Sequence, residues 1–212
     1  MRRVVRALSR VEGLGDPAMT RVAARKRDPF AVLVGTVISL RTRDEVTLPA
    51  ADRLLALAPR VEDLARLSPE RIQRVIYPAG FYRTKGRTLR RIARILLERH
   101  GGRVPDRMED LLLLPGVGRK TANLVLLLGH GIPALCVDTH VHRISNRLGF
   151  VSTRTPDRTE TILRERLPAE LWFSYNELLV RYGKRICTPL SPRCSACAVV
   201  TDCPRIGVAR SR

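Results

Sequence analysis

The 212-residue chain carries 39 Lys and Arg against 20 Asp and Glu, a formal net charge of +19. A surplus of this size exceeds what solubility needs and indicates a polyanionic partner, of which nucleic acid is the simplest. An arginine-rich codon bias would also raise the basic content, but it does not explain why so few acidic residues oppose it. The length admits one substantial core or two small domains that share a cleft.

The N-terminal stretch MRRVVRALSRVEGLGDP is charged throughout, unlike a secretory signal. The longest apolar runs, such as LVLLL at 124–128, are far shorter than the ~18 residues of a membrane span. We therefore expect a soluble cytoplasmic protein associated with the nucleoid, with no signal peptide and no contact with the membrane. Thiols stay reduced in that compartment, so clustered cysteines indicate metal binding rather than disulfides.

Apolar residues recur mainly at intervals of three and four with arginines between them, which is typical of amphipathic helices, and the alternation typical of strands is scarce. Proline and glycine breaks separate these segments. The pattern predicts an all-α protein, with helices at about 2–12, 29–40, 44–58, 61–67, 69–76, 84–100, 107–113, 119–129, 139–149, 155–167 and 170–184.

Phe81 and Tyr82 lie in AGFYRTKGR, a predicted turn between helices, beside Arg83 and Lys85. Aromatic residues make up only 4% of the chain, so an exposed pair next to basic residues is a candidate wedge of the kind that unstacks DNA. The alternative is that one of the two rings packs in the core.

The segment LLLLPGVGRKTAN predicts two apolar helices joined by a tight turn, a helix-hairpin-helix over about 107–129. Its glycines let the backbone approach a phosphate closely, and the N–H groups that open the second helix can hold that anion. An ordinary two-helix hairpin is the alternative. The candidate DNA-binding residues are Gly116, Val117, Gly118 and Arg119.

Lys120 is one of only four lysines among the 39 basic residues; all the rest are arginine. A guanidinium cannot give up its proton in a protein, whereas an ammonium can become a free amine. Lys120 is therefore a candidate nucleophile. The alternatives are a solvated residue of the first helical turn or a phosphate contact.

Asp138 follows an apolar segment in VDTHVHR and opens the next predicted helix. Aspartate at this position commonly caps the helix. A catalytic role is compatible with capping if only one carboxylate oxygen caps. Asp138 is accordingly a candidate catalytic residue.

Helical periodicity stops near Cys187, where prolines and cysteines take over. Thiolates spaced C-x6-C-x2-C-x5-C within 17 residues cannot all enter a core without a metal. The compact loop followed by proline favours an iron-sulfur cluster, with structural zinc and free thiols as alternatives. The candidate ligands are Cys187, Cys194, Cys197 and Cys203; Cys136 reads as a buried apolar residue.

The hairpin, the VDTH segment and the cysteine loop, in this order and spacing, resemble the endonuclease III family of DNA repair glycosylases from about Phe30 to Cys203. The resemblance implies a six-helix domain at about 22–132 that faces a second domain, made of 1–21 and 133–212, which carries a 4Fe-4S cluster. DNA would lie across the cleft, with Lys120 on one wall and Asp138 on the other. His140 is a further expected DNA contact.

The resemblance also implies a bifunctional DNA glycosylase and AP lyase of base excision repair. This enzyme would remove oxidised pyrimidines such as thymine glycol through a Schiff base on Lys120 and cut 3′ to the abasic site by β-elimination. The partner would be double-stranded DNA that contains damaged bases or abasic sites, and we expect a monomer. Relatives that remove a base without cutting the strand lack this lysine.

The chain departs from the family in ISLRTRD, where relatives carry a glutamine that fills the gap left by the extruded base. Leu40 and Arg41 occupy this segment instead. Leucine can plug a base stack, and arginine can bind guanine or a phosphate. One interpretation is altered recognition of the opposite base, with Arg41 favouring lesions opposite guanine and Leu40 filling the gap. The other is that Leu40 packs in the core and Arg41 binds a phosphate.

Two further functions fit parts of the pattern. A monofunctional mismatch glycosylase would bind DNA without forming a covalent adduct. A non-catalytic DNA-binding protein with a redox-sensing cluster would behave the same when Lys120 and Asp138 are replaced.

Overall fold

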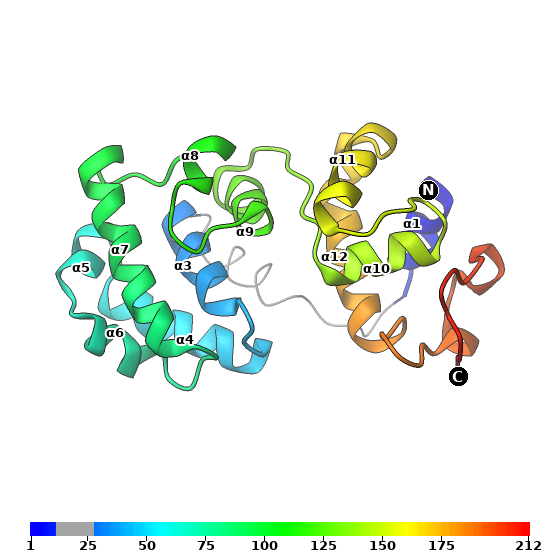
Figure 1. Ribbon diagram of the computed structural model, residues 1–212, viewed down its shortest axis with the longest axis horizontal. Helices are drawn as coiled ribbons and strands as arrows, with labels where there is room; N and C mark the ends of the chain where they lie inside the picture. Colours follow the sequence, from blue (N-terminus) through cyan, green and yellow to red (C-terminus); the bar gives the residue numbers. More distant parts are fainter. Residues whose placement is uncertain (12–27) are drawn as a thin grey trace. The chain divides into compact units, whose positions relative to one another are not determined.

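The computed structural model describes residues 1–11 and 28–212, and in these ranges the chain is helical without a strand (Figure 1). The predicted all-α class is confirmed. The described residues of Ala18–Ile132 form one compact unit, the hairpin unit, and those of Met1–Pro17 with Pro133–Arg212 form another, the terminal unit. The helix predicted at 2–12 is shorter, since α1 (Arg2–Ser9) ends at Ser9 with Arg10 as its C-cap. The domain boundary predicted between residues 21 and 22 lies outside the described residues.

The core of the hairpin unit is built around α3 (Pro29–Ser39). Nine of its 11 residues are buried, as expected for a helix that is apolar on all sides. Asp28 caps its start by accepting hydrogen bonds from the Phe30 and Ala31 N–H groups, at 3.0 and 3.3 Å. The other α-helices described in this unit are α4 (Asp44–Leu57), α5 (Val61–Arg66), α6 (Pro69–Ile76), α7 (Tyr82–His100), α8 (Met108–Leu112) and α9 (Arg119–Leu124).

The helix predicted at 119–129 changes its winding part-way. After α9 the chain continues as a π-helix, η1 (Val125–His130), and ends at Gly131, whose φ is +70°. A side chain at Gly129 would come within 2.8 Å of the Pro29 Cα atom, so glycine lets η1 pass close to the start of α3. Periodicity of apolar residues does not distinguish this wider winding from an α-helix.

The terminal unit packs α1 (Arg2–Ser9) with three helices from the other end of the chain: α10 (Thr139–Arg147), α11 (Pro156–Arg166) and α12 (Trp172–Arg185). The fully buried side chains of Leu8, Val141, Leu163 and Tyr175 meet in its core. The short 3-10 turns of this unit are η2 (Ala169–Leu171), η3 (Cys194–Ala196) and η4 (Val200–Asp202).

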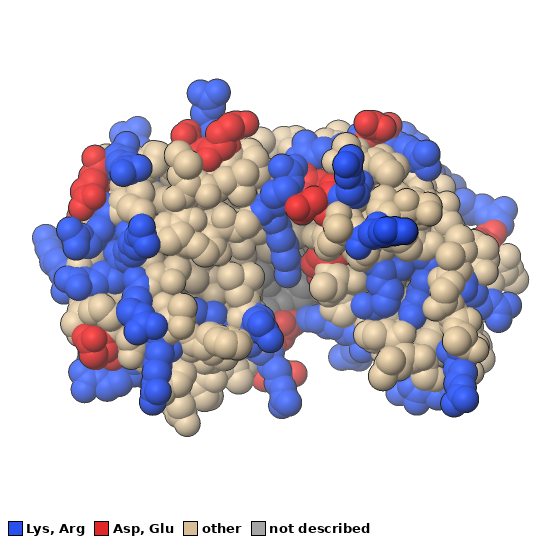
Figure 2. All heavy atoms as spheres, viewed as in Figure 1, with Lys and Arg blue, Asp and Glu red and all other residues tan. Residues whose placement is uncertain are grey.

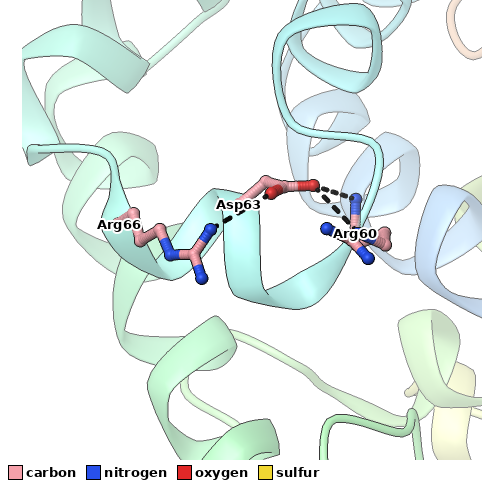
Figure 3. A network of polar contacts seen from close by, with 3 residues as sticks. All are labelled: Arg60, Asp63 and Arg66. Atoms are coloured by element: carbon pink, nitrogen blue, oxygen red, sulfur yellow. Dashed lines mark hydrogen bonds and ion pairs between the residues drawn. The ribbon is translucent and has the colours of Figure 1, made fainter.

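Charged residues also stabilise local structure, as at the start of α5 (Figure 3). The Asp63 carboxylate accepts a hydrogen bond from the Arg60 backbone N–H at 3.3 Å and pairs with the Arg60 and Arg66 guanidinium groups at 3.4 and 3.8 Å. The first contact caps the helix. Exposed ion pairs of this kind contribute little to stability.

Lys and Arg side chains are scattered over the face of both units shown in Figure 2, and Asp and Glu side chains are fewer. The acidic side chains cannot neutralise all the basic ones, because the chain holds 39 basic and 20 acidic residues. Within residues 1–11 and 28–212, no helix is long and apolar enough to cross a membrane.

Candidate nucleic-acid interface and active site

The predicted hairpin is present as α8, a tight turn and α9. Gly116 adopts a left-handed backbone with a φ of +73°, and the Val117 N–H donates to the Leu114 carbonyl at 3.1 Å. Gly118 is the N-cap of α9, and a side chain built there would meet no atom within 4 Å. The fold therefore leaves open space beside the start of α9, where the helix dipole and N–H groups favour an anion.

Lys120 is the second residue of α9, and its side chain is exposed. The two residues that follow, Thr121 and Ala122, are buried with 2% and 0% exposure, so they anchor this helical turn in the hairpin unit. The turn presents the amine to a ligand from a fixed backbone. This position suits both the nucleophile and the phosphate contact considered above.

Asp138 belongs to the terminal unit, where it caps α10. Its Oδ1 atom accepts both capping hydrogen bonds, from the His140 N–H at 2.8 Å and the Val141 N–H at 2.9 Å. Among the described residues, no hydrogen bond to Oδ2 is seen, although the side chain is only 9% exposed. The carboxylate thus meets the condition set by the sequence: one oxygen caps the helix and the other is available for a further role.

The ring of His140 packs against α12. A side chain at Gly183 would overlap this ring, so glycine allows α10 and α12 to approach closely. The His140 Nδ1 atom also lies 3.2 Å from the Arg143 guanidinium. His140 remains half-buried, and its predicted contact with DNA stays a prediction.

Two arginines of α10 hold the cysteine loop. Arg143 Nη2 donates to the carbonyls of Cys187, at 2.8 Å, and Gly183, at 3.1 Å. Arg147, only 7% exposed, donates to the Thr188 and Pro189 carbonyls at 2.7 and 2.6 Å, and its Nη1 atom lies 3.3 Å from the Cys187 sulfur. The helix that Asp138 caps therefore also fixes the start of this loop.

The four cysteines of this loop line one cavity of about 30 Å³ together with Arg147. All five cysteines are free thiols, and Cys136 is buried, as predicted. Within the described ranges, no three or more His, Cys, Asp or Glu side chains are placed to hold a metal ion, so the structure does not itself show a metal site.

The chemistry of the cysteine loop nevertheless fits a metal centre. Burial raises the pKa of Cys197 and of Cys203, and the other thiols of the loop raise it further. Four ionised thiolates so close together need a compensating cation. Arg147 places one guanidinium beside the Cys187 sulfur, and the apolar core beneath the loop, which includes Val199 at 3% exposure, supplies no charge.

The structure brings together the two segments that the sequence proposes as DNA contacts, ISLRTRD at 38–44 and AGFYRTKGR at 79–87. The Arg41 guanidinium lies over the ring of Phe81, 4.9 Å from its centroid, and Phe81 is 59% exposed. Tyr82 is half-buried and meets the ring of Tyr77 edge-on at 5.3 Å, so one of the two aromatic residues packs and the other is exposed. Leu40 is half-buried.

Lys85 is the residue whose role the sequence analysis missed. It was grouped with Arg83 as a basic neighbour of an exposed pair, but its side chain is only 6% exposed. Its ammonium donates to the carbonyls of Ile38 and Leu40, both at 2.6 Å, and to the Thr42 hydroxyl at 2.7 Å. The available signal is the one that distinguishes Lys120: a lysine in a chain that uses arginine for nearly all of its basic residues.

Comparison with known proteins identifies the family to which the chain belongs. The family model of the HhH-GPD superfamily base excision DNA repair proteins matches residues 34–169, more than half of the chain. Endonuclease III of Thermotoga maritima is 51% identical over 179 residues, which cover 84% of each chain. The chain belongs to the endonuclease III family.

A solved structure and a second sequence relative agree with this assignment. A trapped covalent endonuclease III–DNA intermediate with an estranged adenine matches with a TM-score of 0.79 at 32% identity and 84% coverage of each chain. A chloroplastic endonuclease III homologue of Arabidopsis thaliana is 45% identical over 186 residues, and the match spans 48% of that longer protein. The predicted enzyme class, an endonuclease III type DNA glycosylase and AP lyase of base excision repair, is confirmed.

Proposed function

We propose that this protein removes oxidised pyrimidines such as thymine glycol from double-stranded DNA and then cuts the strand 3′ to the abasic site. The observation that carries the proposal is Lys120. It is an exposed lysine on the first turn of the second hairpin helix, in a chain that has only four lysines among its 39 basic residues. A covalent complex with DNA is known for a structural neighbour, the trapped endonuclease III intermediate.

The proposed reaction begins with attack by the neutral Lys120 amine on C1′ of a nucleotide flipped out of the duplex. The bond from C1′ to the base breaks, and the base leaves with the electron pair and takes up a proton. Opening of the sugar ring leaves a Schiff base between Lys120 and C1′. Loss of a proton from C2′ then expels the 3′ phosphate, and water releases the enzyme.

Asp138 is the proposed partner of Lys120. Its Oδ2 atom can accept the proton of the attacking amine and stabilise positive charge that develops on the sugar. Support comes from the capping pattern, in which both hydrogen bonds go to Oδ1. The cap also fixes the orientation of the carboxylate, so it needs little rearrangement during the reaction.

The proposed phosphate contacts come from the hairpin turn, residues 116–119, with the backbone at Gly118 closest to the DNA. The open space beside Gly118 supports this assignment, because no described residue approaches closely enough to exclude a side chain there. Such contacts position the duplex without reading its sequence. We propose that the enzyme acts as a monomer.

We also propose that Cys187, Cys194, Cys197 and Cys203 hold a 4Fe-4S cluster. When bound, it would neutralise four thiolates and tie the loop together. Arg143 and Arg147 support the loop as well, because their hydrogen bonds to backbone carbonyls fix its start. A structural role follows, since these contacts join the loop to the helix that Asp138 caps.

Trapping with sodium borohydride tests the assignment of the nucleophile. Reduction of the Schiff base should join wild-type protein covalently to a thymine glycol duplex. Lys120→Gln should give no adduct and no cleavage while its affinity for DNA stays within about threefold, because one charge is lost from a large basic surface. Lys120→Arg should fail as well, since its guanidinium keeps the charge but cannot act as an amine.

Adduct at wild-type levels in Lys120→Gln would remove Lys120 as the nucleophile. Base release by wild-type protein without adduct or strand cleavage would instead indicate a monofunctional glycosylase.

A further inference from the structure

Lys85 closes the end of α3 with an unusually complete set of hydrogen bonds. An ammonium has three protons to donate, and the structure provides three acceptors, at 2.6, 2.6 and 2.7 Å. Two of these are the Ile38 and Leu40 carbonyls at the C-terminal end of α3, where carbonyls lack partners within the helix and the dipole favours a cation. Each proton of the buried ammonium group therefore has an acceptor.

The third acceptor, the Thr42 hydroxyl, joins the segment after α3 to the turn before α7. The same oxygen accepts a hydrogen bond from the Gly80 N–H at 3.1 Å. Any side chain at Gly80 would overlap the Arg41 carbonyl oxygen, so the two backbones are in direct contact. Lys85, Thr42 and Gly80 thus lock the two turns to each other.

This lock holds the backbone in conformations that the sequence alone would disfavour. Arg41 and Phe81 have φ values of +53° and +56°, in the left-handed region that residues other than glycine rarely adopt. Strain of this kind persists only where the surrounding structure enforces it, and it gathers at functional sites. Here it places the Arg41 guanidinium over the exposed Phe81 ring, 4.9 Å from the centroid.

We propose that Lys85 is a positioning residue that, through Thr42, holds Arg41 and Phe81 as one stacked pair for contact with the bases around the flipped nucleotide. The inference rests on the proposed function, because the pair needs an opened base stack to contact. The flat faces of a guanidinium and a phenyl ring stack on any base. Lys85 itself, being buried, acts only through the backbone it holds.

The lock requires the charged form of Lys85. Burial lowers its pKa from 10.5 to about 8, so at pH 7 the ammonium form predominates. The groups that face it are two backbone carbonyls and one hydroxyl, and among the described residues no ionised side chain contributes to the shift. A neutral amine has only two protons to donate and would leave one acceptor without a partner.

A matched pair of variants at position 42 tests the lock without removing the buried charge. Thr42→Val keeps the shape but loses the shared hydroxyl, whereas Thr42→Ser keeps the hydroxyl. We expect Thr42→Val to bind a duplex with a tetrahydrofuran abasic analogue about fivefold more weakly than wild type, and Thr42→Ser to match wild type.

The pH profile separates positioning from general loss of structure. If binding needs protonated Lys85, wild-type affinity for the same duplex should fall about tenfold between pH 7 and pH 9. Lys85→Met should bind weakly at pH 7 and show no such fall. Equal affinities for wild type, Thr42→Val and Lys85→Met, or equal pH profiles, would overturn the inference. A wild-type protein that forms no borohydride adduct would instead overturn the proposed function.

Discussion

Asp138 shows how one carboxylate can serve the fold and the reaction. Its Oδ1 atom accepts the hydrogen bonds from the first turn of α10, and Oδ2 receives none from the described residues. The two roles can be separated by substitution, because an amide oxygen caps a helix almost as well as a carboxylate but carries no charge. Substitutions of Asp138 can therefore test its capping role and its catalytic role independently.

We predict that Asp138→Asn lowers the single-turnover rate of base removal about a hundredfold while the unfolding free energy changes by less than about 0.5 kcal/mol. Asp138→Ala is the control, since it loses the cap as well and should cost about 1 kcal/mol of stability. Single-turnover kinetics and urea denaturation measure the two effects. An asparagine variant with the wild-type rate would show that only the cap matters.

Asp138 and Lys85 show which roles of a single residue can be predicted from the sequence and which cannot. The run VDTH predicts a helix cap because the signal is local, and the structure confirms the cap. Lys85 gives no such local signal, since its partners Ile38 and Leu40 lie 47 and 45 residues away. Its burial follows from the packing of α7 on α3, which spacing along the chain does not specify.

Among the elements, α10 connects the most features: it is capped by Asp138, packs His140 on α12 and holds the cysteine loop through Arg143 and Arg147. Its register against α12 depends on Gly183, which leaves room for the His140 ring. The contact is buried, because Gly183 lies among the buried residues of α12. A shift of α12 here would move the start of the cysteine loop.

Gly183→Ala should therefore destabilise the protein by about 1–3 kcal/mol, although alanine is the better helix former, because its methyl group overlaps His140. Lys184→Ala, at the next and exposed position of α12, is the control and should change stability by less than about 0.5 kcal/mol. Thermal unfolding of both variants provides the comparison. A stabilised Gly183→Ala would mean that the His140 ring moves aside without cost.

The helices themselves were largely predictable, because apolar periodicity and caps are local signals. Asp28-Pro29 and Ser68-Pro69 correctly predict the starts of α3 and α6. The change to π-helix at Val125 and the start of α7 at Tyr82 rather than residue 84 were not predicted. The second depends on the left-handed Phe81 that precedes α7, a conformation enforced by the neighbouring turn.

On the scale of the whole molecule, the terminal unit joins both ends of the chain through one core. Val4, Val5 and Leu8 of α1 share this core with Tyr182 of α12 and with Val199 inside the cysteine loop. Three cysteines of the loop pack against the same core, so the state of the loop should affect α1 nearly 190 residues away in sequence. The cysteine spacing predicts the loop but not this connection to α1.

We predict that the purified protein is brown, contains about four irons per chain, and loses them in Cys194→Ser. Without the cation, repulsion among the remaining thiolates should loosen the loop and the core beneath it. Hydrogen exchange should then speed up in α1 and the end of α12, whereas α3, in the hairpin unit, should stay protected. Cys136→Ala is the matched control, because Cys136 is buried outside the loop and should leave the iron in place. Zinc after anaerobic purification, or loss of protection in α3 alone, would contradict this view of the cysteine loop.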